Sequence, residues 1–160
     1  MEKRLVFIRH AHRDTSDRDA DNGLSEKGWD QAHALAQEFV STFKDQKAVL
    51  LSSARTRCVE TLEPIAKLTG VKIKISPLLM EQEQGESFRE MAARVETFLE
   101  DWKETTAELT LACSHGDWLP VALDELVDEQ IEMKKGAWAE VVWKGSKAKL
   151  SRVIQKPQKE

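Results

Sequence analysis

Leu5-Val6-Phe7-Ile8-Arg9-His10-Ala11 is the stretch of sequence that decides the fold. An apolar run this short is typical of a strand that is buried on both faces of a parallel sheet. Similar runs recur at residues 49–51, 71–75 and 109–112. Because Arg9 and His10 follow the first run directly, we expect both side chains at the carboxyl end of its strand.

Amphipathic stretches with helical spacing separate these runs. The first begins after Ser25, which is a suitable N-cap, and the second covers residues 56–68 and ends at Gly70. Pro64 is expected to kink or interrupt the second helix. Further helices are predicted over residues 87–104 and after Asp117. Strands alternating with helices predict an α/β protein, a three-layer α/β/α sandwich with a mostly parallel central sheet.

The C-terminal part of the sequence breaks this alternation. Residues 137–143 and 148–154 flank a segment that contains glycine, which predicts a β-hairpin. No repeat, low-complexity segment or linker divides the chain, so residues 1–160 are predicted to form a single domain. The polar residues 155–160 are expected to fray.

Composition limits the function classes. The chain has 160 residues, with 24 Lys and Arg against 28 Asp and Glu, which gives a net charge of −4. This balance disfavours a nucleic-acid partner, because nucleic-acid-binding surfaces are strongly basic. No apolar run is long enough to cross a bilayer, and we expect a cytoplasmic protein without a membrane partner. The oligomeric state is not readable.

Polar residues follow several of the predicted strands. His10 and His115 each come directly after an apolar run, and Arg57 stands at the opening of the helix that follows another. Open α/β sheets bind ligands beyond the carboxyl ends of their strands. These residues therefore converge on one site if the strands are neighbours in a parallel sheet. His33, in contrast, lies within a helical pattern among polar neighbours and is predicted to be a surface residue.

This set of side chains suits phosphoryl chemistry. Arginines such as Arg9 and Arg57 bind two phosphate oxygens at a time, and a neutral imidazole can attack phosphorus and carry the phosphoryl group. Nearby cations keep that imidazole unprotonated and stabilise charge in the transition state. A carboxylic acid then supplies a proton to the leaving group. Because the arginines do the electrostatic task that magnesium does elsewhere, neither a metal nor a cofactor is predicted.

Four segments resemble a known family, in the order in which they occur along the chain: Leu5 to Ala11, Asn22 to Ala32, Ser53 to Thr61 and Cys113 to Asp117. They resemble the motifs of the histidine phosphatase superfamily, which includes the cofactor-dependent phosphoglycerate mutases. The resemblance implies that His10 is the nucleophile that becomes phosphorylated. It also implies that Arg9, Arg57 and His115 hold the phosphoryl oxygens as catalytic and substrate-binding residues.

The predicted site also needs a proton donor, for which the sequence offers more than one candidate. The family's donor often lies in a Leu-x-Glu-x-x-x-Gly segment, and residues 79–85 match this pattern with Glu81. Glu81 is alternatively a member of a solvated acidic run. The sequence after the nucleophile departs from the mutases, so Asp14 or Asp17 is a second candidate donor, and Arg13 a candidate substrate contact. The role of His12 stays open.

Few residues are available to cover the predicted site. Only residues 76–86 separate the third strand from its helix, so we expect an open phosphate site. An open site resembles the short SixA-type members, which act on phosphohistidine in proteins, and it also suits a small phosphomonoester. The predicted partner is therefore a phosphorylated small molecule or a phosphohistidine protein. Mutase activity is disfavoured, because re-donating the phosphoryl group needs an enclosed pocket.

Three other readings compete with this one. His10 and His12 form an H-x-H pattern that is found in metal hydrolases, but Thr15 stands where one such class needs a histidine. A cysteine phosphatase needs Cys-x5-Arg, which neither Cys58 nor Cys113 provides, so both are predicted to be small buried side chains. The third is a non-catalytic module that binds phosphate or phosphohistidine on the same fold.

Overall fold

The computed structural model describes residues 2–157, which form a six-stranded sheet in the order β3-β2-β4-β1-β5-β6. The strands are β1 (Glu2–Arg9), β2 (Val49–Ser52), β3 (Ile73–Ile75), β4 (Leu109–Ser114), β5 (Trp138–Lys144) and β6 (Lys147–Ile154). The helices are α1 (Glu26–Phe43), α2 (Thr56–Thr69), α3 (Phe88–Glu104) and α4 (Trp118–Val127), with a short 3-10 turn, η1, at Pro77–Leu79.

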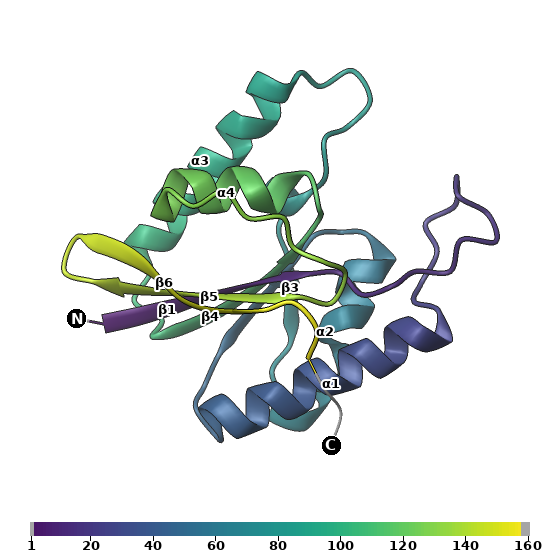
Figure 1. Ribbon diagram of the computed structural model, residues 1–160, viewed down its shortest axis with the longest axis horizontal. Helices are drawn as coiled ribbons and strands as arrows, with labels where there is room; N and C mark the ends of the chain where they lie inside the picture. Colours follow the sequence, from purple (N-terminus) through teal and green to yellow (C-terminus); the bar gives the residue numbers. More distant parts are fainter. Residues whose placement is uncertain (1, 158–160) are drawn as a thin grey trace.

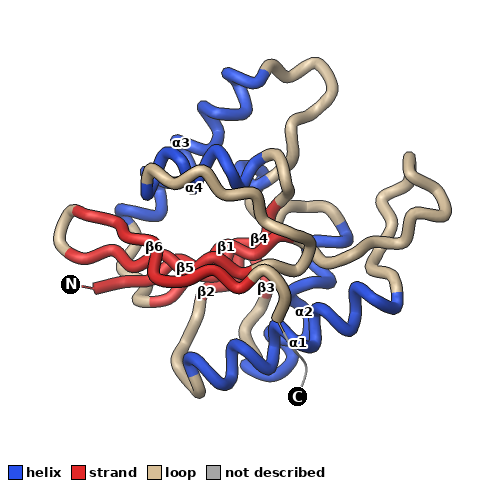
Figure 2. The backbone as a smooth tube through the Cα atoms, viewed as in Figure 1, coloured by secondary structure: helices blue, strands red, loops and turns tan. Residues whose placement is uncertain are grey.

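The sheet separates two layers of helices, as Figure 1 shows, with α3 and α4 on one face and α1 and α2 on the other. Strands β1 to β4 run parallel to one another, while β5 is antiparallel to both of its neighbours, β1 and β6. Figure 2 shows the same arrangement, with the strands in one layer between the helices. The predicted three-layer α/β/α sandwich with a mostly parallel sheet and a C-terminal hairpin is therefore confirmed.

Strand β1 lies inside the sheet and is buried on both faces, as its apolar run predicted. Leu5 and Phe7 pack into the cluster of side chains that contains those of α3 and α4. Val6 and Ile8 point to the other face and pack into the cluster that contains those of α1 and α2. All four side chains are fully buried. Because side chains alternate along a strand, a continuous apolar run serves both layers at once.

Helix α2 is continuous through Pro64, so the predicted interruption was wrong. Proline removes one backbone hydrogen bond from the helix, at a cost of about 3 kcal/mol. On the same helix, Cys58, Leu62 and Ile65 are fully buried against the sheet. Each fully buried side chain of the size of Leu or Ile contributes about 1.5–3 kcal/mol, so tertiary packing outweighs the local penalty.

Strand β3 also differs from its prediction. It covers only Ile73–Ile75, and it is the edge strand of the sheet, not a strand buried on both faces. Lys74 is exposed, and 51% of Ile75 is accessible to solvent. An edge strand with a charged side chain resists pairing with another chain, which sequence periodicity does not reveal.

The C-terminal hairpin turns at Gly145, which has the left-handed backbone conformation that the turn requires. Beyond β6, the Gln155 side chain accepts a hydrogen bond from the backbone N–H of Lys134 and donates one to the carbonyl of Glu132. The fraying predicted for residues 155–160 therefore does not extend to Gln155, and residues 158–160 lie outside the described part of the chain. Within residues 2–157, no helix is long and apolar enough to span a membrane.

Candidate active site

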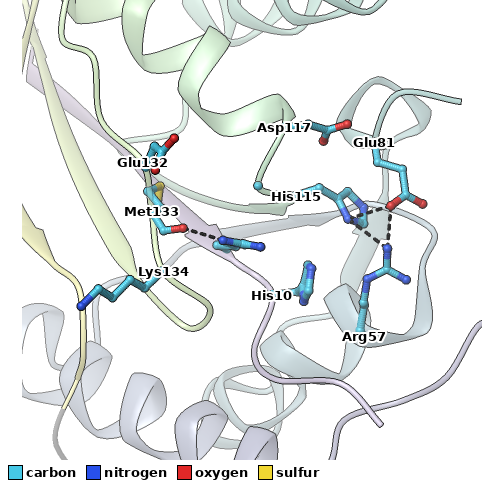
Figure 3. Close-up of a pocket in the computed structure, with 10 residues that line it drawn as sticks. His10, Arg57, Glu81, His115, Asp117, Glu132, Met133 and Lys134 are labelled. Carbon is cyan, nitrogen blue, oxygen red and sulfur yellow. Dashed lines mark hydrogen bonds and ion pairs between the residues drawn. The ribbon is translucent and has the colours of Figure 1, made fainter. Parts of the chain in front are cut away.

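The carboxyl ends of β1, β4 and β2 lie side by side and open into a pocket of about 550 Å³. It is lined by Arg9, His10, Arg57, Glu81, His115, Gly116, Asp117, Glu132, Met133 and Lys134. Figure 3 shows His10, His115, Arg57 and Glu81 grouped at one end of this pocket. The condition set by the sequence, that these strands are parallel neighbours, is therefore met.

The His10 ring is held in one protonation state. It is 6% exposed, and its Nδ1 lies 2.9 Å from the carbonyl oxygen of Ala11. Since a carbonyl oxygen only accepts, Nδ1 must carry the proton. Burial, together with smaller effects of His115, Arg57 and Arg9, lowers the pKa of His10 to about 3, against the opposing effect of the Ala11 hydrogen bond. The ring is neutral, and Nε2 carries its lone pair.

Neighbouring elements hold the backbone on either side of this ring. The N–H of His10 donates to the carbonyl of Ser114 on β4, over 3.1 Å. The N–H of Ala11 donates to Oγ1 of Thr61, over 2.9 Å, and that hydroxyl donates to the carbonyl of Arg57. Strand β4 and helix α2 therefore fix the chain at the point where it carries the imidazole.

Two guanidinium groups in the pocket have buried nitrogens without a partner. Arg57 donates from Nη2 to Glu81, and Arg9 donates from Nη1 to the carbonyl of Met133 over 2.8 Å. The Nε atoms of Arg9 and Arg57 are both buried, and within residues 2–157 neither has a hydrogen-bond partner. Buried donors of this kind are rare in proteins and call for an explanation. Both arginines line the pocket, where their positive charges favour an anion.

Gly116 follows His115 and lets the chain pass close to Arg9. A Cβ at Gly116 would lie 2.7 Å from Cζ of Arg9 and 2.8 Å from its Nη2. Any larger residue would therefore have to displace the guanidinium. The absence of a side chain in the turn between β4 and α4 is what leaves room for Arg9 in the pocket.

His115 also lines the pocket and is buried, at 3% exposure. Its Nε2 makes a hydrogen bond of 2.8 Å with Oγ of Ser53, at the end of β2. Its Nδ1 lies 3.5 Å from Glu81 and the same distance from Nη2 of Arg57. The centroids of the His10 and His115 rings are 5.4 Å apart, so the two imidazoles face a common space.

Glu81 lies in the site and is not part of a solvated acidic run. Its Oε1 accepts from Nε of Arg55 and its Oε2 accepts from Nη2 of Arg57, each over 2.6 Å. Burial raises the pKa of Glu81, but His115, Arg57 and Arg55 together outweigh this effect, so its pKa lies below the ordinary value. At neutral pH the carboxyl group is therefore an ionised carboxylate.

The alternative proton donors lie elsewhere. Asp14 and Asp17 are exposed and do not line the pocket. Their carboxylates accept hydrogen bonds from the backbone N–H groups of Ser16 and Asp19, within the loop between β1 and α1. These aspartates shape their own loop, as short polar side chains do in turns.

Arg13 lines a neighbouring, smaller pocket of about 200 Å³, not the one around His10. Its Nη2 donates to the carbonyl of Arg18 over 3.3 Å. Arg57 and Glu81 line both pockets and form the wall between them. Arg13 therefore does not line the pocket around His10, where the sequence predicted it to contact the substrate.

Sequence reasoning missed one side of the pocket. Glu132, Met133 and Lys134 come from the connection between α4 and β5, which carries no motif. The N–H of Gly136 donates to the carbonyls of Arg9 and His10, and this contact brings the connection to the site. Asp117, the last residue of the segment that begins at Cys113, was given no role from the sequence. Its carboxylate accepts a hydrogen bond from the N–H of Gln82 over 2.9 Å.

His12 contacts a helix cap. Its Nδ1 lies 2.7 Å from Oγ of Ser25, the N-cap of α1. Within the described part of the chain, no group of three or more His, Cys, Asp and Glu side chains is placed to hold a metal ion. Cys58 and Cys113 are fully buried and free, as predicted.

Fold and site together define an α/β protein with a neutral histidine and two arginines in one pocket at the carboxyl ends of parallel strands. The sequence pattern of the histidine phosphatase superfamily (branch 1) matches residues 5–86 and 81–155, and the chain belongs to this superfamily. A search of curated proteins gave no match.

Solved structures with the same fold cover nearly the whole chain. A putative alpha-ribazole-5'-P phosphatase from Escherichia coli has a TM-score of 0.84 and 20% identity, covering 98% of this chain and 99% of its own. A mycobacterial glucosyl-3-phosphoglycerate phosphatase complexed with VO3 has a TM-score of 0.76 and 17% identity, covering 94% and 98%. A phosphoserine phosphatase mutant from Entamoeba histolytica has a TM-score of 0.74 and 14% identity, covering 94% and 96%.

Proposed function

We propose that this protein is a metal-independent phosphatase that works through a covalent phosphohistidine on His10. The observation that carries the proposal is the state of His10. Its Nδ1–H is bonded to Ala11, it is neutral, and its Nε2 lone pair is free beside two arginines with unpartnered buried donors. A neutral nucleophile next to an anion site is the arrangement that phosphoryl transfer through histidine needs.

In the first step, Arg9, Arg57 and His115 hold the phosphoryl oxygens and spread their charge. Nε2 of His10 forms a bond to phosphorus while the bond from phosphorus to the leaving group breaks. The negative charge of the bound phosphoryl group raises the pKa of Glu81, so that Glu81 carries a proton in the substrate complex and gives it to the leaving group. The Nδ1–H of His10 stays hydrogen-bonded to the carbonyl oxygen of Ala11, and this contact stabilises the positive charge that forms on the phosphorylated ring.

In the second step, water attacks phosphorus and the bond to Nε2 of His10 breaks. Glu81, left ionised by the first step, takes the proton of the water. Phosphate leaves and the neutral imidazole is restored. Since the arginines supply the positive charge at phosphorus, no step requires a divalent cation.

The substrate is a phosphomonoester or a phosphohistidine of a protein, as in the SixA-type members. Support for a small phosphomonoester comes from the names of the similar structures, which are phosphatases of ribazole phosphate, of glucosyl-3-phosphoglycerate and of phosphoserine. Under this proposal, a substrate that extends beyond the phosphoryl group contacts Arg13, which lines the neighbouring pocket.

The test is hydrolysis of para-nitrophenyl phosphate and of phosphohistidine peptides by the wild-type protein and by His10→Ala. We expect turnover that is lost by at least 1,000-fold in the variant, because the nucleophile is gone. Vanadate, which takes the five-coordinate geometry of the transition state, should inhibit, and EDTA should not. The neighbour solved with VO3 makes vanadate a reasonable probe.

Three outcomes would contradict the proposal. Full activity of His10→Ala would remove His10 as the nucleophile. Loss of activity in EDTA, restored by a divalent cation, would indicate a metal hydrolase. Tight phosphate binding without turnover of any phosphate ester or phosphohistidine peptide would indicate a non-catalytic binding module.

A further inference from the structure

Glu81 has a second arginine partner that the family motifs do not include. Nε of Arg55 donates to Oε1 of Glu81 over 2.6 Å, and Nη2 of Arg57 donates to Oε2 over the same distance. Each carboxylate oxygen therefore has its own guanidinium. Arg55 lines the smaller pocket and not the one around His10, so its guanidinium reaches Glu81 from outside the phosphoryl site.

The backbone of Arg55 is held in place independently of this ion pair. Arg55 is the N-cap residue of α2, and its N–H donates to Oγ of Ser53 over 3.2 Å. Its carbonyl accepts from the N–H groups of Cys58 and Val59 in the first turn of the helix. Only the side chain, which is 39% exposed, is committed to Glu81. A substitution of this side chain therefore leaves the backbone contacts of the helix end in place.

Arg55 and Arg57 have different roles in the proposed reaction. Arg57 lines the pocket around His10 and must hold the phosphoryl group, so its contact with Glu81 is shared with the substrate. Arg55 does not line the pocket around His10, so its contact with Glu81 is not shared with the phosphoryl group. With only Arg57 as a partner, the carboxylate would be held at one oxygen and would be free to rotate about that contact.

We propose that Arg55 is a positioning residue that holds the carboxyl group of Glu81 against the phosphoryl site and helps to set when it carries a proton. The inference rests on the proposed function, since it concerns the proton donor of that reaction. It assigns to Arg55 no contact with the phosphoryl group.

The electrostatics of the site support this role. The hydrogen bond and the charge of Arg55 both lower the pKa of Glu81, against the effect of burial. Loss of Arg55 therefore raises the pKa of Glu81. Glu81 acts as an acid in the first step and as a base in the second. In either role, the limb of the pH–rate profile that depends on its pKa moves to higher pH when Arg55 is lost.

The test compares kcat/KM of wild type, Arg55→Gln and Arg55→Lys over a range of pH. We expect Arg55→Gln to lose about tenfold or more in kcat/KM, because a misplaced proton donor slows the chemistry, and to shift the Glu81-dependent limb to higher pH. Arg55→Lys keeps the positive charge but not the planar guanidinium. Because the charge is kept, the Glu81-dependent limb of its pH profile should lie near that of the wild type. Arg89→Gln is the matched control, since Arg89 is exposed on α3 and lines neither pocket.

Several results would overturn the inference. A rise in KM at unchanged kcat and unchanged pH profile would make Arg55 a substrate contact. A uniform loss at all pH values, with a lowered melting temperature, would make it structural. A wild-type protein without phosphatase activity would instead refute the proposed function, and an inactive Glu81→Gln beside an unaffected Arg55→Gln would refute only the role of Arg55.

Discussion

His10 illustrates how one backbone contact determines the chemistry of a side chain. The carbonyl of Ala11 accepts a hydrogen bond from Nδ1–H, and burial disfavours a second proton on the ring. Thr61 and Ser114 hold the backbone that makes this possible. The nucleophilic lone pair thus depends on residues from α2 and β4, which lie far from His10 in the sequence.

The lowered pKa of His10 predicts a pH dependence of stability. In the unfolded chain the pKa of histidine is about 6.5, whereas in the folded protein it is about 3. The unfolded state therefore binds an extra proton between these values, and the protein loses stability as the pH falls from about 6.5 towards 3. His10 alone contributes a slope of up to about 1.4 kcal/mol per pH unit in this window.

Urea unfolding of the wild type and of His10→Asn between pH 4.5 and 7.5 measures this contribution. Asparagine keeps a donor near the Ala11 carbonyl and does not titrate, so the free energy of unfolding of the variant should fall less steeply with acid. Equal slopes for the two proteins would mean that His10 is protonated in the folded state.

At the scale of elements, the turns after the strands position the site. The turn between β4 and α4 carries His115 and then Gly116, where a Cβ would collide with the guanidinium of Arg9. The connection between α4 and β5 returns to the same place, because Gly136 bonds to the carbonyls of Arg9 and His10. Two turns from opposite ends of α4 therefore enclose Arg9.

Gly116→Ala is predicted to damage the site through Arg9. The added methyl group must push the guanidinium away, and a displacement of about 1 Å can cost 10- to 100-fold in kcat/KM. Steady-state kinetics on para-nitrophenyl phosphate measure the loss. Gly116 has no left-handed backbone conformation, so no backbone strain is added.

A double-mutant cycle with Arg9→Gln separates this effect from others. If Gly116→Ala acts by displacing Arg9, it should cost little more once Arg9 has been replaced. Additive losses would show that the methyl group disturbs something other than the guanidinium.

At the scale of the whole molecule, the sheet order brings distant segments together. Strands β2, β4 and β1 are neighbours although they are not consecutive in the chain, and their carboxyl ends share one edge. Arg57, which follows β2, thereby meets His10 and His115. The pocket gathers the positive charges of Arg9, Arg57 and Lys134, and the carboxylates of Glu81, Asp117 and Glu132 also line it.

An anion that fills this pocket should stabilise the folded protein. At a concentration of vanadate or phosphate that is 100 times its Kd, binding adds about 2.7 kcal/mol. For a domain of this size, that corresponds to a rise of about 5–10 °C in Tm. Arg57→Gln should lose most of the rise, which a thermal melt with and without the anion measures for each variant. An equal rise in both proteins would place the anion elsewhere.

Much of the fold and part of the site could be read from the sequence. The apolar run from Leu5 to Ile8 and the alternation of strands and helices predicted the sandwich, because burial on both faces demands such a pattern. Pro64 was misjudged, since local propensity does not include the packing of the rest of α2. The edge position of β3 was also missed, since it depends on which strands pair.

The sequence by itself determined the types of element, their order and the residues that follow each strand, because these depend on the local periodicity of side chains and on short motifs. Only the tertiary structure decided that Glu81 is clamped between Arg55 and Arg57 and that Arg13 lies in a separate pocket. It also decided that residues 132–134 line the site. These are contacts between segments far apart in the chain, and they exist only once the sheet order and the packing of the helices have placed those segments side by side.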